Sequence, residues 1–191
     1  TPSLQTISRS AGRSAVAAAA YRACVKLIDQ TTGLIHDYTK KKGHVETILI
    51  GADDISELWS KAELAETRKN STVARELMLP LPDQWTDNER RECVRDIAQH
   101  LRDTYGVAAA GSIHAANRHD RNGHCHLMFT TRVVDDDGNF GKKTRILDDM
   151  KTGEVKRLRE AICKIINDHA EKLGSDFYVY AGKFSDIDKT T

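Results

Sequence analysis

The 191-residue sequence lacks the marks of several specialised protein classes. Its four cysteines lie far apart without a Cys-x-x-Cys pair, which excludes a disulfide framework and a cysteine-rich zinc site. No stretch approaches the ~20 consecutive apolar residues of a membrane span, and the N-terminus lacks a basic-then-apolar signal pattern. Aromatic residues make up only 6% of the chain, too few for an extended base-stacking platform. We therefore expect a globular protein of the reducing cytoplasm.

A surplus of one charge sign is also missing, because 29 Lys and Arg balance 28 Asp and Glu for a net charge of +1. Since nucleic-acid binding usually requires a basic excess, this total alone argues against such a partner. The distribution is uneven, however. Residues 1–50 carry seven basic and three acidic side chains, residues 51–110 carry eight and twelve, and residues 111–191 carry fourteen and thirteen. Affinity for phosphates is therefore expected on one face, near the N-terminal quarter.

The order of helix and strand patterns predicts an α+β fold, with an antiparallel central sheet and helices packed on it. An alanine-rich run predicts a helix over 13–28. Amphipathic patterns predict further helices beginning at residue 55, over 86–106 and over 153–173. Strand patterns cover 33–38, 45–50, 72–79, 107–115 and 124–134. We expect one domain over 1–191, complete in itself or the N-terminal part of a longer protein.

Three of the eight histidines fall in one predicted strand-loop-strand unit. His124 and His126 are two residues apart on a strand and project from the same face, whereas Cys125 points towards the core. His114 ends the preceding strand, and the short polar loop predicts a hairpin that sets it opposite His124. Three such imidazoles suit a divalent metal ion with open coordination positions. A polar surface position is the alternative for each histidine, and His119 in the loop is either a substitute ligand or faces solvent or DNA.

Tyr21 lies in the alanine-rich predicted helix, with Arg13 and Arg22 as basic neighbours. With a metal ion in the same domain, this phenol suits attack on a phosphodiester that gives a covalent phosphotyrosine. A core tyrosine with its hydroxyl at the surface is the alternative. Glu76 falls in a predicted strand and is a candidate for the same site. Its alternatives are an exposed strand position and an ion pair with Arg75.

Several separated blocks of the sequence resemble the MobA/MobL relaxases of mobilisable plasmids, including the relaxase part of TraA-type transfer proteins. The blocks are residues 6–14 with 21–23, 68–76, 113–114 with 124–128, and 143–155. They follow the family's order and span most of residues 6–170. Two departures are a first strand without the usual Tyr-His and an ending, residues 177–182, unlike that of other members.

The resemblance implies a two-histidine (HUH) endonuclease fold and a nickase of transfer origins. Tyr21 would be the nucleophile, leaving a 3′-hydroxyl and a 5′-phosphotyrosyl link that the reverse reaction can rejoin. His114, His124 and His126 would hold a divalent ion such as Mg2+ or Mn2+, and Glu76 would assist the tyrosine or the site. The implied partners are single-stranded origin DNA, relaxosome accessory proteins and a coupling protein.

Basic side chains near these residues are the candidate DNA contacts, because contacts to phosphates position a strand without reading its bases. In the basic N-terminal quarter they are Arg9, Arg13 and Arg22. Around the histidine loops we expect Arg118, Arg121, Lys142, Lys143 and Arg145.

Two other functions stay open on the sequence alone. One is a three-histidine, metal-dependent hydrolase or oxygenase that acts on a small substrate, with Tyr21 structural. The other is a DNA-binding accessory module without catalysis. Tyr38 and Tyr105 also remain as substitutes for Tyr21.

Overall fold

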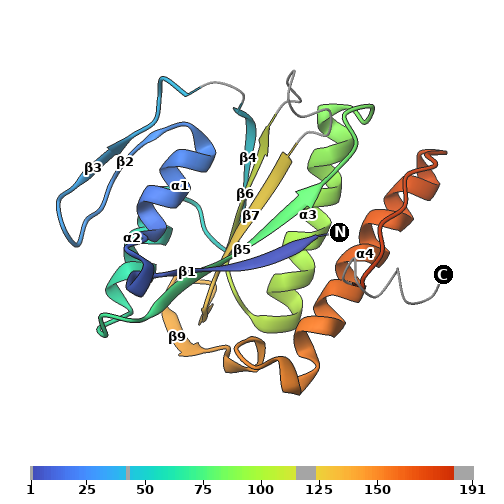
Figure 1. The fold of residues 1–191 in the computed structure, drawn as a ribbon. Coiled ribbons are helices and arrows are strands. Elements are labelled where there is room, and N and C mark those ends of the chain that lie inside the picture. The colour runs from blue at the N-terminus through green and yellow to red at the C-terminus, as the bar shows by residue number, and fades with distance from the viewer. Residues whose placement is uncertain (1, 42–43, 115–123, 183–191) are drawn as a thin grey trace.

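The computed structural model describes residues 2–41, 44–114 and 124–182, with the backbone alone for residues 44, 45 and 124. At its centre lies a five-stranded sheet of order β1-β5-β7-β6-β4 (Figure 1). In that order the strands are β1 (Ser3–Ser8), β5 (Thr72–Pro80), β7 (His124–Thr130), β6 (Ala109–His114) and β4 (His44–Ile50). Every neighbouring pair is antiparallel, which confirms the predicted α+β fold.

Helices cover both faces of the sheet (Figure 1). The α-helices of the described residues are α1 (Ala15–Ala23), α2 (Ile55–Leu64), α3 (Asp87–Tyr105) and α4 (Glu154–Lys172). One hydrophobic core lies between the sheet and the pair α1 and α2, and a second lies between the sheet and the pair α3 and α4. The sheet is therefore the middle layer of three, and each of its faces has a different environment.

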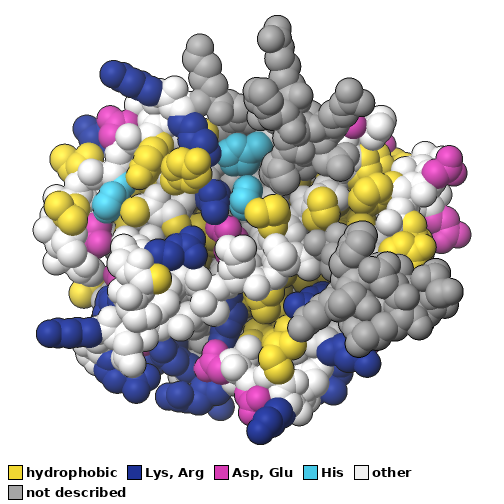
Figure 2. Space-filling view, in the orientation of Figure 1, with side chains coloured by type: hydrophobic (Ala, Val, Ile, Leu, Met, Phe, Trp, Pro, Cys, Tyr) yellow, Lys and Arg dark blue, Asp and Glu magenta, His cyan; other side chains and the backbone are white. Residues whose placement is uncertain are grey.

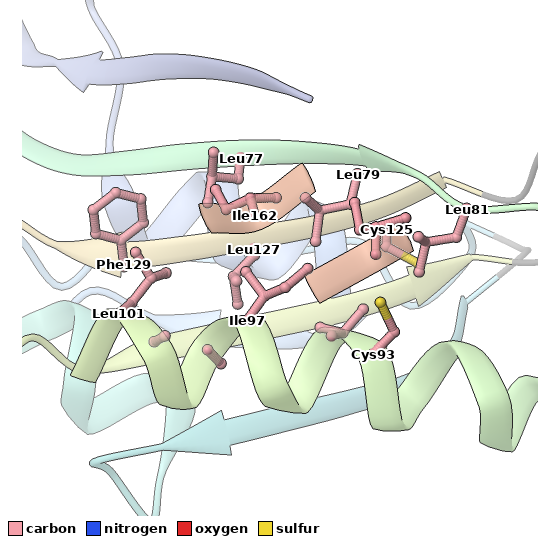
Figure 3. Packing of buried hydrophobic residues seen from close by; sticks show 14 of the residues in the cluster. Leu77, Leu79, Leu81, Cys93, Ile97, Leu101, Cys125, Leu127, Phe129 and Ile162 are labelled. Atoms are coloured by element: carbon pink, nitrogen blue, oxygen red, sulfur yellow. The ribbon is translucent and has the colours of Figure 1, made fainter. Parts of the chain in front are cut away.

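The alternation of side chains along β7 shows how the strand serves both cores. Cys125, Leu127 and Phe129 are fully buried and point towards α3, where they meet residues such as Ile97 (Figure 3). Met128 belongs to the other core, with the alanines of α1. Because side chains alternate along a strand, the even-numbered residues of β7 lie on the face that α1 covers. The predicted inward direction of Cys125 is confirmed.

The alanine-rich helix is shorter than predicted. Its start is capped by Ser14, whose side chain accepts a hydrogen bond from the Ala17 amide. It ends at Ala23 because Cys24 takes a left-handed conformation with φ 54°, which ends the helical hydrogen bonding. Residues 26–28, predicted to be helical, instead form β2 (Lys26–Ile28), which pairs with β3 (Ile35–Asp37).

The other predicted helices and strands are present, but one predicted strand is divided into two. A capping box starts α3, since Thr86 and Glu89 each accept a hydrogen bond from the other's backbone amide. The strand predicted over 124–134 is interrupted at Thr131 and continues as a separate strand. The remaining short elements are β8 (Arg132–Val134), β9 (Phe140–Lys143), and the 3-10 helices η1 (Arg9–Ala11), η2 (Arg145–Leu147) and η3 (Met150–Thr152). Within the described ranges, no helix combines the length and apolarity that a bilayer crossing requires.

Candidate active site

Three candidate side chains lie on the sheet face that α1 covers. His126 pairs with Ser112 of β6 on one side and with Met78 of β5 on the other. Glu76 comes two residues before Met78 and His114 two residues after Ser112, so all three candidates share one face. The rings of His114 and His126 lie 5.8 Å apart between centroids, nearly perpendicular to each other at 82°. The structure brings these two predicted ligands together, and their binding of a metal stays a prediction.

Glu76 joins α1 to the histidine face. Its side chain is 3% exposed and binds Arg22 through both oxygens, with Nε 3.1 Å from Oε2 and Nη2 3.0 Å from Oε1. His126 Nδ1 lies 3.4 Å from Oε1. Burial would raise the pKa of this carboxyl, but hydrogen bonds from His126 and Arg22 outweigh burial and lower the pKa to about 2. Neither alternative for Glu76 holds, because it is buried and because Arg75 pairs with Asp148 instead.

Tyr21 stands on the surface beside this network. It belongs to the last turn of α1, next to Arg22, and is 41% exposed, so it is not a core tyrosine. The ring of Tyr38 meets its ring edge to face, with 5.2 Å between centroids and 87° between planes. Two cations lie near the phenol ring: Lys41 Nζ is 3.6 Å and Arg22 Cζ 5.2 Å from its centroid. The candidate nucleophile is therefore exposed, bracketed by cations and adjacent to the residue that holds Glu76.

The two substitute tyrosines differ sharply in position. Tyr105 packs against the core of α3 and α4, on the opposite sheet face, and donates a hydrogen bond to Glu154 at 2.7 Å. Burial and that hydrogen bond both raise the pKa of Tyr105, so it is unsuited to act as the nucleophile of this face. Tyr38 touches Tyr21. The sequence offered Tyr38 only as a substitute for Tyr21 and gave no role to Lys41. Pairing of β2 with β3 brings the chain after β3 back to the end of α1, so recognising that hairpin would have pointed to both residues.

The predicted metal site is described only in part. His124 opens β7, but its side chain is outside the described part of the structure, as are Arg118, His119 and Arg121. Among the described residues, no group of three or more His, Cys, Asp or Glu is placed to hold a metal ion. His114 and His126 supply two imidazoles of the predicted three. The metal site stays a prediction that includes His124.

Besides Arg22, which binds Glu76, two further predicted DNA contacts of the N-terminal quarter are engaged within the protein. Arg9 Nη2 pairs with Glu63 at 2.8 Å, while the other oxygen of Glu63 accepts a hydrogen bond from the Ala15 amide at 2.7 Å. This pair fastens the start of α1. Arg13 Nη1 donates to the Thr6 carbonyl at 3.1 Å. Both arginines therefore have structural partners, and their contact with DNA stays a prediction.

Lys142, Lys143 and Arg145 are the predicted DNA contacts that the chain carries after β8. Lys143 does not lie beside the histidines as expected, and contact of the three residues with DNA stays a prediction. Lys143 Nζ lies 3.5 Å from the carbonyl oxygen of Thr72, the first residue of β5, whereas His126 pairs with Met78 at the other end of that strand. Six residues of strand separate the two places, about 20 Å. Figure 2 shows Lys and Arg side chains both beside the histidines and in a larger group along the lower edge.

Comparison with solved structures defines the class of fold. The structure reported as "Molecular Basis of Vancomycin Resistance Transfer in Staphylococcus aureus" matches with a TM-score of 0.82 and 26% sequence identity, over 96% of this chain and 98% of that one. Conjugative relaxase TrwC in complex with OriT DNA matches with a TM-score of 0.55 and 13% identity, over 96% and 74%. The fold is that of the HUH relaxases, as the resemblance implied.

Comparison of sequences then gives the family. The MobA/MobL family model matches residues 13–184. Mobilization protein MobL of Acidithiobacillus ferridurans is 38% identical over 173 residues, and conjugal transfer protein TraA of Agrobacterium fabrum is 31% identical over 166. Each match takes in 76% of this chain, but 46% of MobL and 14% of TraA. This chain belongs to the MobA/MobL family, and it spans about half the length of MobL and a small part of TraA.

Proposed function

We propose that this chain is the nicking domain of a relaxase that cuts one DNA strand at an origin of transfer. One connected set of contacts carries the proposal: Tyr21 adjoins Arg22, Arg22 binds Glu76, and Glu76 binds His126 beside His114. Family membership supports the same reading. The exposure of Tyr21 favours a polymer as substrate, since sites for small molecules are mostly enclosed and apolar.

In the proposed reaction, the phenolic oxygen of Tyr21 attacks the scissile phosphorus in line with the 3′-oxygen. A bond forms between that oxygen and phosphorus while the bond from phosphorus to the 3′-oxygen breaks. The phenolic proton ends on the 3′-oxygen, so the products are a 3′-hydroxyl and a 5′-phosphotyrosyl link. Because one phosphodiester replaces another, the reverse reaction can rejoin the strand without nucleotide hydrolysis.

A divalent ion, Mg2+ or Mn2+, is part of the proposal, and a TrwC neighbour is reported as metal-bound. His114 and His126 would hold it with His124, the first residue of β7. When bound, such an ion neutralises charge on the non-bridging phosphate oxygens. Two imidazoles fit a divalent ion in general, and Mg2+ and Mn2+ prefer oxygen ligands, which the phosphate itself would add.

Glu76 and Arg22 are proposed to hold the site in shape. The carboxylate accepts hydrogen bonds from Arg22 and faces His126 Nδ1. It therefore fixes the ring orientation of His126 and holds the end of α1, which carries Arg22. Tyr21 moves with that helix end. The network thereby sets the nucleophile in a fixed place relative to the histidine face.

Single-stranded origin DNA is the proposed partner, and two TrwC neighbours are reported as complexes with such DNA. We propose that the DNA strand extends from Tyr21 towards the end of the sheet where β5 begins, which we call the basic end of the sheet because Lys143 lies there. Its phosphates would contact Lys142, Lys143 and Arg145 there, about 20 Å from the histidines. Relaxosome accessory proteins, a coupling protein and a cytoplasmic location belong to the proposal through the family alone.

A denaturation-resistant protein-DNA adduct tests the proposal. The protein is incubated with Mn2+ and a single-stranded oligonucleotide from the transfer origin of the element that encodes it, then denatured and separated on a gel. We expect an adduct with the wild type and with Tyr178→Phe, a control at a 60% exposed tyrosine, and none with Tyr21→Phe. An adduct with Tyr21→Phe would refute the assignment of the nucleophile. Tight DNA binding by the wild type without any adduct would favour the accessory-module function.

A further inference from the structure

We propose that Tyr38 and Lys41, in the segment that follows β3, are positioning residues for Tyr21. They hold the phenol in one orientation for attack and keep a positive charge beside it. The inference rests on the proposed function, because it assigns a purpose to the neighbours of the candidate nucleophile. It goes beyond that function by giving a role to the segment after β3, whose residues take no part in the proposed bond changes.

Three contacts from this one segment converge on Tyr21. Lys41 Nζ lies 3.6 Å from the centroid of the phenol ring. The same nitrogen donates a hydrogen bond to the Tyr21 carbonyl oxygen at 3.2 Å. The ring of Tyr38 meets the phenol edge to face. Lys41 thus binds both the backbone and the side chain of Tyr21, which is more than a chance surface contact requires.

The segment has its own bonds that fix it in this place. The Asp37 carboxylate accepts hydrogen bonds from the Thr39 amide at 3.0 Å and the Thr39 hydroxyl at 2.7 Å. The Lys41 amide donates to the Tyr38 carbonyl at 3.0 Å, closing a turn. The Tyr38 amide in turn donates to the Val25 carbonyl at 3.1 Å, just after α1 ends. The segment is therefore tied to the end of the helix that carries Tyr21.

An exposed tyrosine at a helix end needs such support if it is a nucleophile. With 41% of its surface exposed, Tyr21 has little core packing to select one rotamer. In-line attack requires the oxygen in a narrow region near phosphorus, so a freely turning ring would react slowly. An edge-to-face aromatic neighbour and a cation over the ring each favour one orientation. The cation also favours the negative charge that the phenolic oxygen carries as its proton leaves.

The test separates positioning from binding. Single-turnover adduct formation is measured with the origin oligonucleotide, and the Kd for the same DNA is measured by anisotropy. For Lys41→Met and for Tyr38→Leu we expect the rate of adduct formation to fall on the order of tenfold, with Kd changed by less than about twofold. Lys41→Arg and Tyr38→Phe keep the cation and the ring and should retain most of the rate. Lys40→Met, one residue away and exposed, is the matched control and should react like the wild type.

A second readout does not depend on DNA. With 3-fluorotyrosine incorporated at position 21, the 19F resonance reports the surroundings of the ring. Lys41→Met and Tyr38→Leu should shift or split this resonance, and Lys40→Met should leave it in place. An unchanged resonance in both variants, or a shifted resonance with an unchanged adduct rate, would overturn the positioning role. Failure of the proposed function itself is recognised separately, because the wild type would then form no adduct or an adduct would persist in Tyr21→Phe.

Discussion

Replacing Glu76 by Gln should destabilise the protein in a way that depends on pH. The side chain is 3% exposed and is the common acceptor for Arg22 and His126. Gln keeps the size of the side chain but loses the charge that binds the guanidinium. Removing one partner of a buried ion pair leaves the other buried and uncompensated, which is costly.

The size of the effect follows from the pKa of Glu76, lowered from its ordinary 4.5 to about 2 in the folded protein. That difference corresponds to about 3 kcal/mol of folding free energy at neutral pH. Because the folded pKa is depressed, this stabilisation is fully present above pH 4.5 and is lost as the pH falls towards 2. Integration of the linkage relation leaves about 1 kcal/mol at pH 3.

The assay is urea unfolding of the wild type and Glu76→Gln at pH 7 and pH 3. We expect the gap between the two proteins to shrink by about 2 kcal/mol on acidification. Asp168→Asn is the control, since that carboxylate pairs with Lys164 and both side chains are more than half exposed, so the pair should contribute little. A gap of the same size at both pH values would refute the reasoning, because the ionised carboxylate would then contribute nothing to stability.

Three further changes test other parts of the structure. Glu63→Gln should cost about 1 to 3 kcal/mol in urea unfolding, since the buried carboxylate accepts from the Ala15 amide through one oxygen and from Arg9 through the other, and the NH2 of Gln cannot accept; an unaltered midpoint would contradict this role. His126→Ala should abolish Mn2+ binding in a calorimetric titration, whereas unaltered affinity would place the metal elsewhere. Lys142→Gln with Arg145→Gln should reduce the salt dependence of binding to single-stranded DNA by about 0.7 in log-log slope for each phosphate that is no longer neutralised. An unchanged slope would show that DNA does not reach the basic end of the sheet.

Much of the fold follows from local signals in the sequence. Thr86 and Glu89 mark the start of α3 because the capping box is a local hydrogen-bond pattern. The alternation along β7 separates His126 from Cys125 because strand geometry has a period of two. The convergence of His114 and His126 could be predicted because consecutive strands commonly pair as a hairpin, as β6 and β7 do.

What the sequence could not reveal depends on contacts between distant segments. Arg22 and Glu76 are 54 residues apart, and their pairing depends on how α1 lies over the sheet. The neighbouring Arg75, which the sequence offered as a partner, pairs with Asp148 instead. The place of Lys143 depends on the path of the chain after β7, which turns away from the histidines. The end of α1 at Cys24 goes against the helical preference of the alanine run, because the following residues pair as a hairpin strand.

Identifying the residue that becomes linked to DNA tests directly whether Tyr21 is the nucleophile. The adduct formed with origin DNA and Mn2+ is digested with protease and nuclease, and the modified peptide is sequenced by mass spectrometry. We expect a nucleotide on the phenolic oxygen of Tyr21, linked through a 5′-phosphate. Linkage to Tyr38 or any other residue, or a link through a 3′-phosphate, would contradict it.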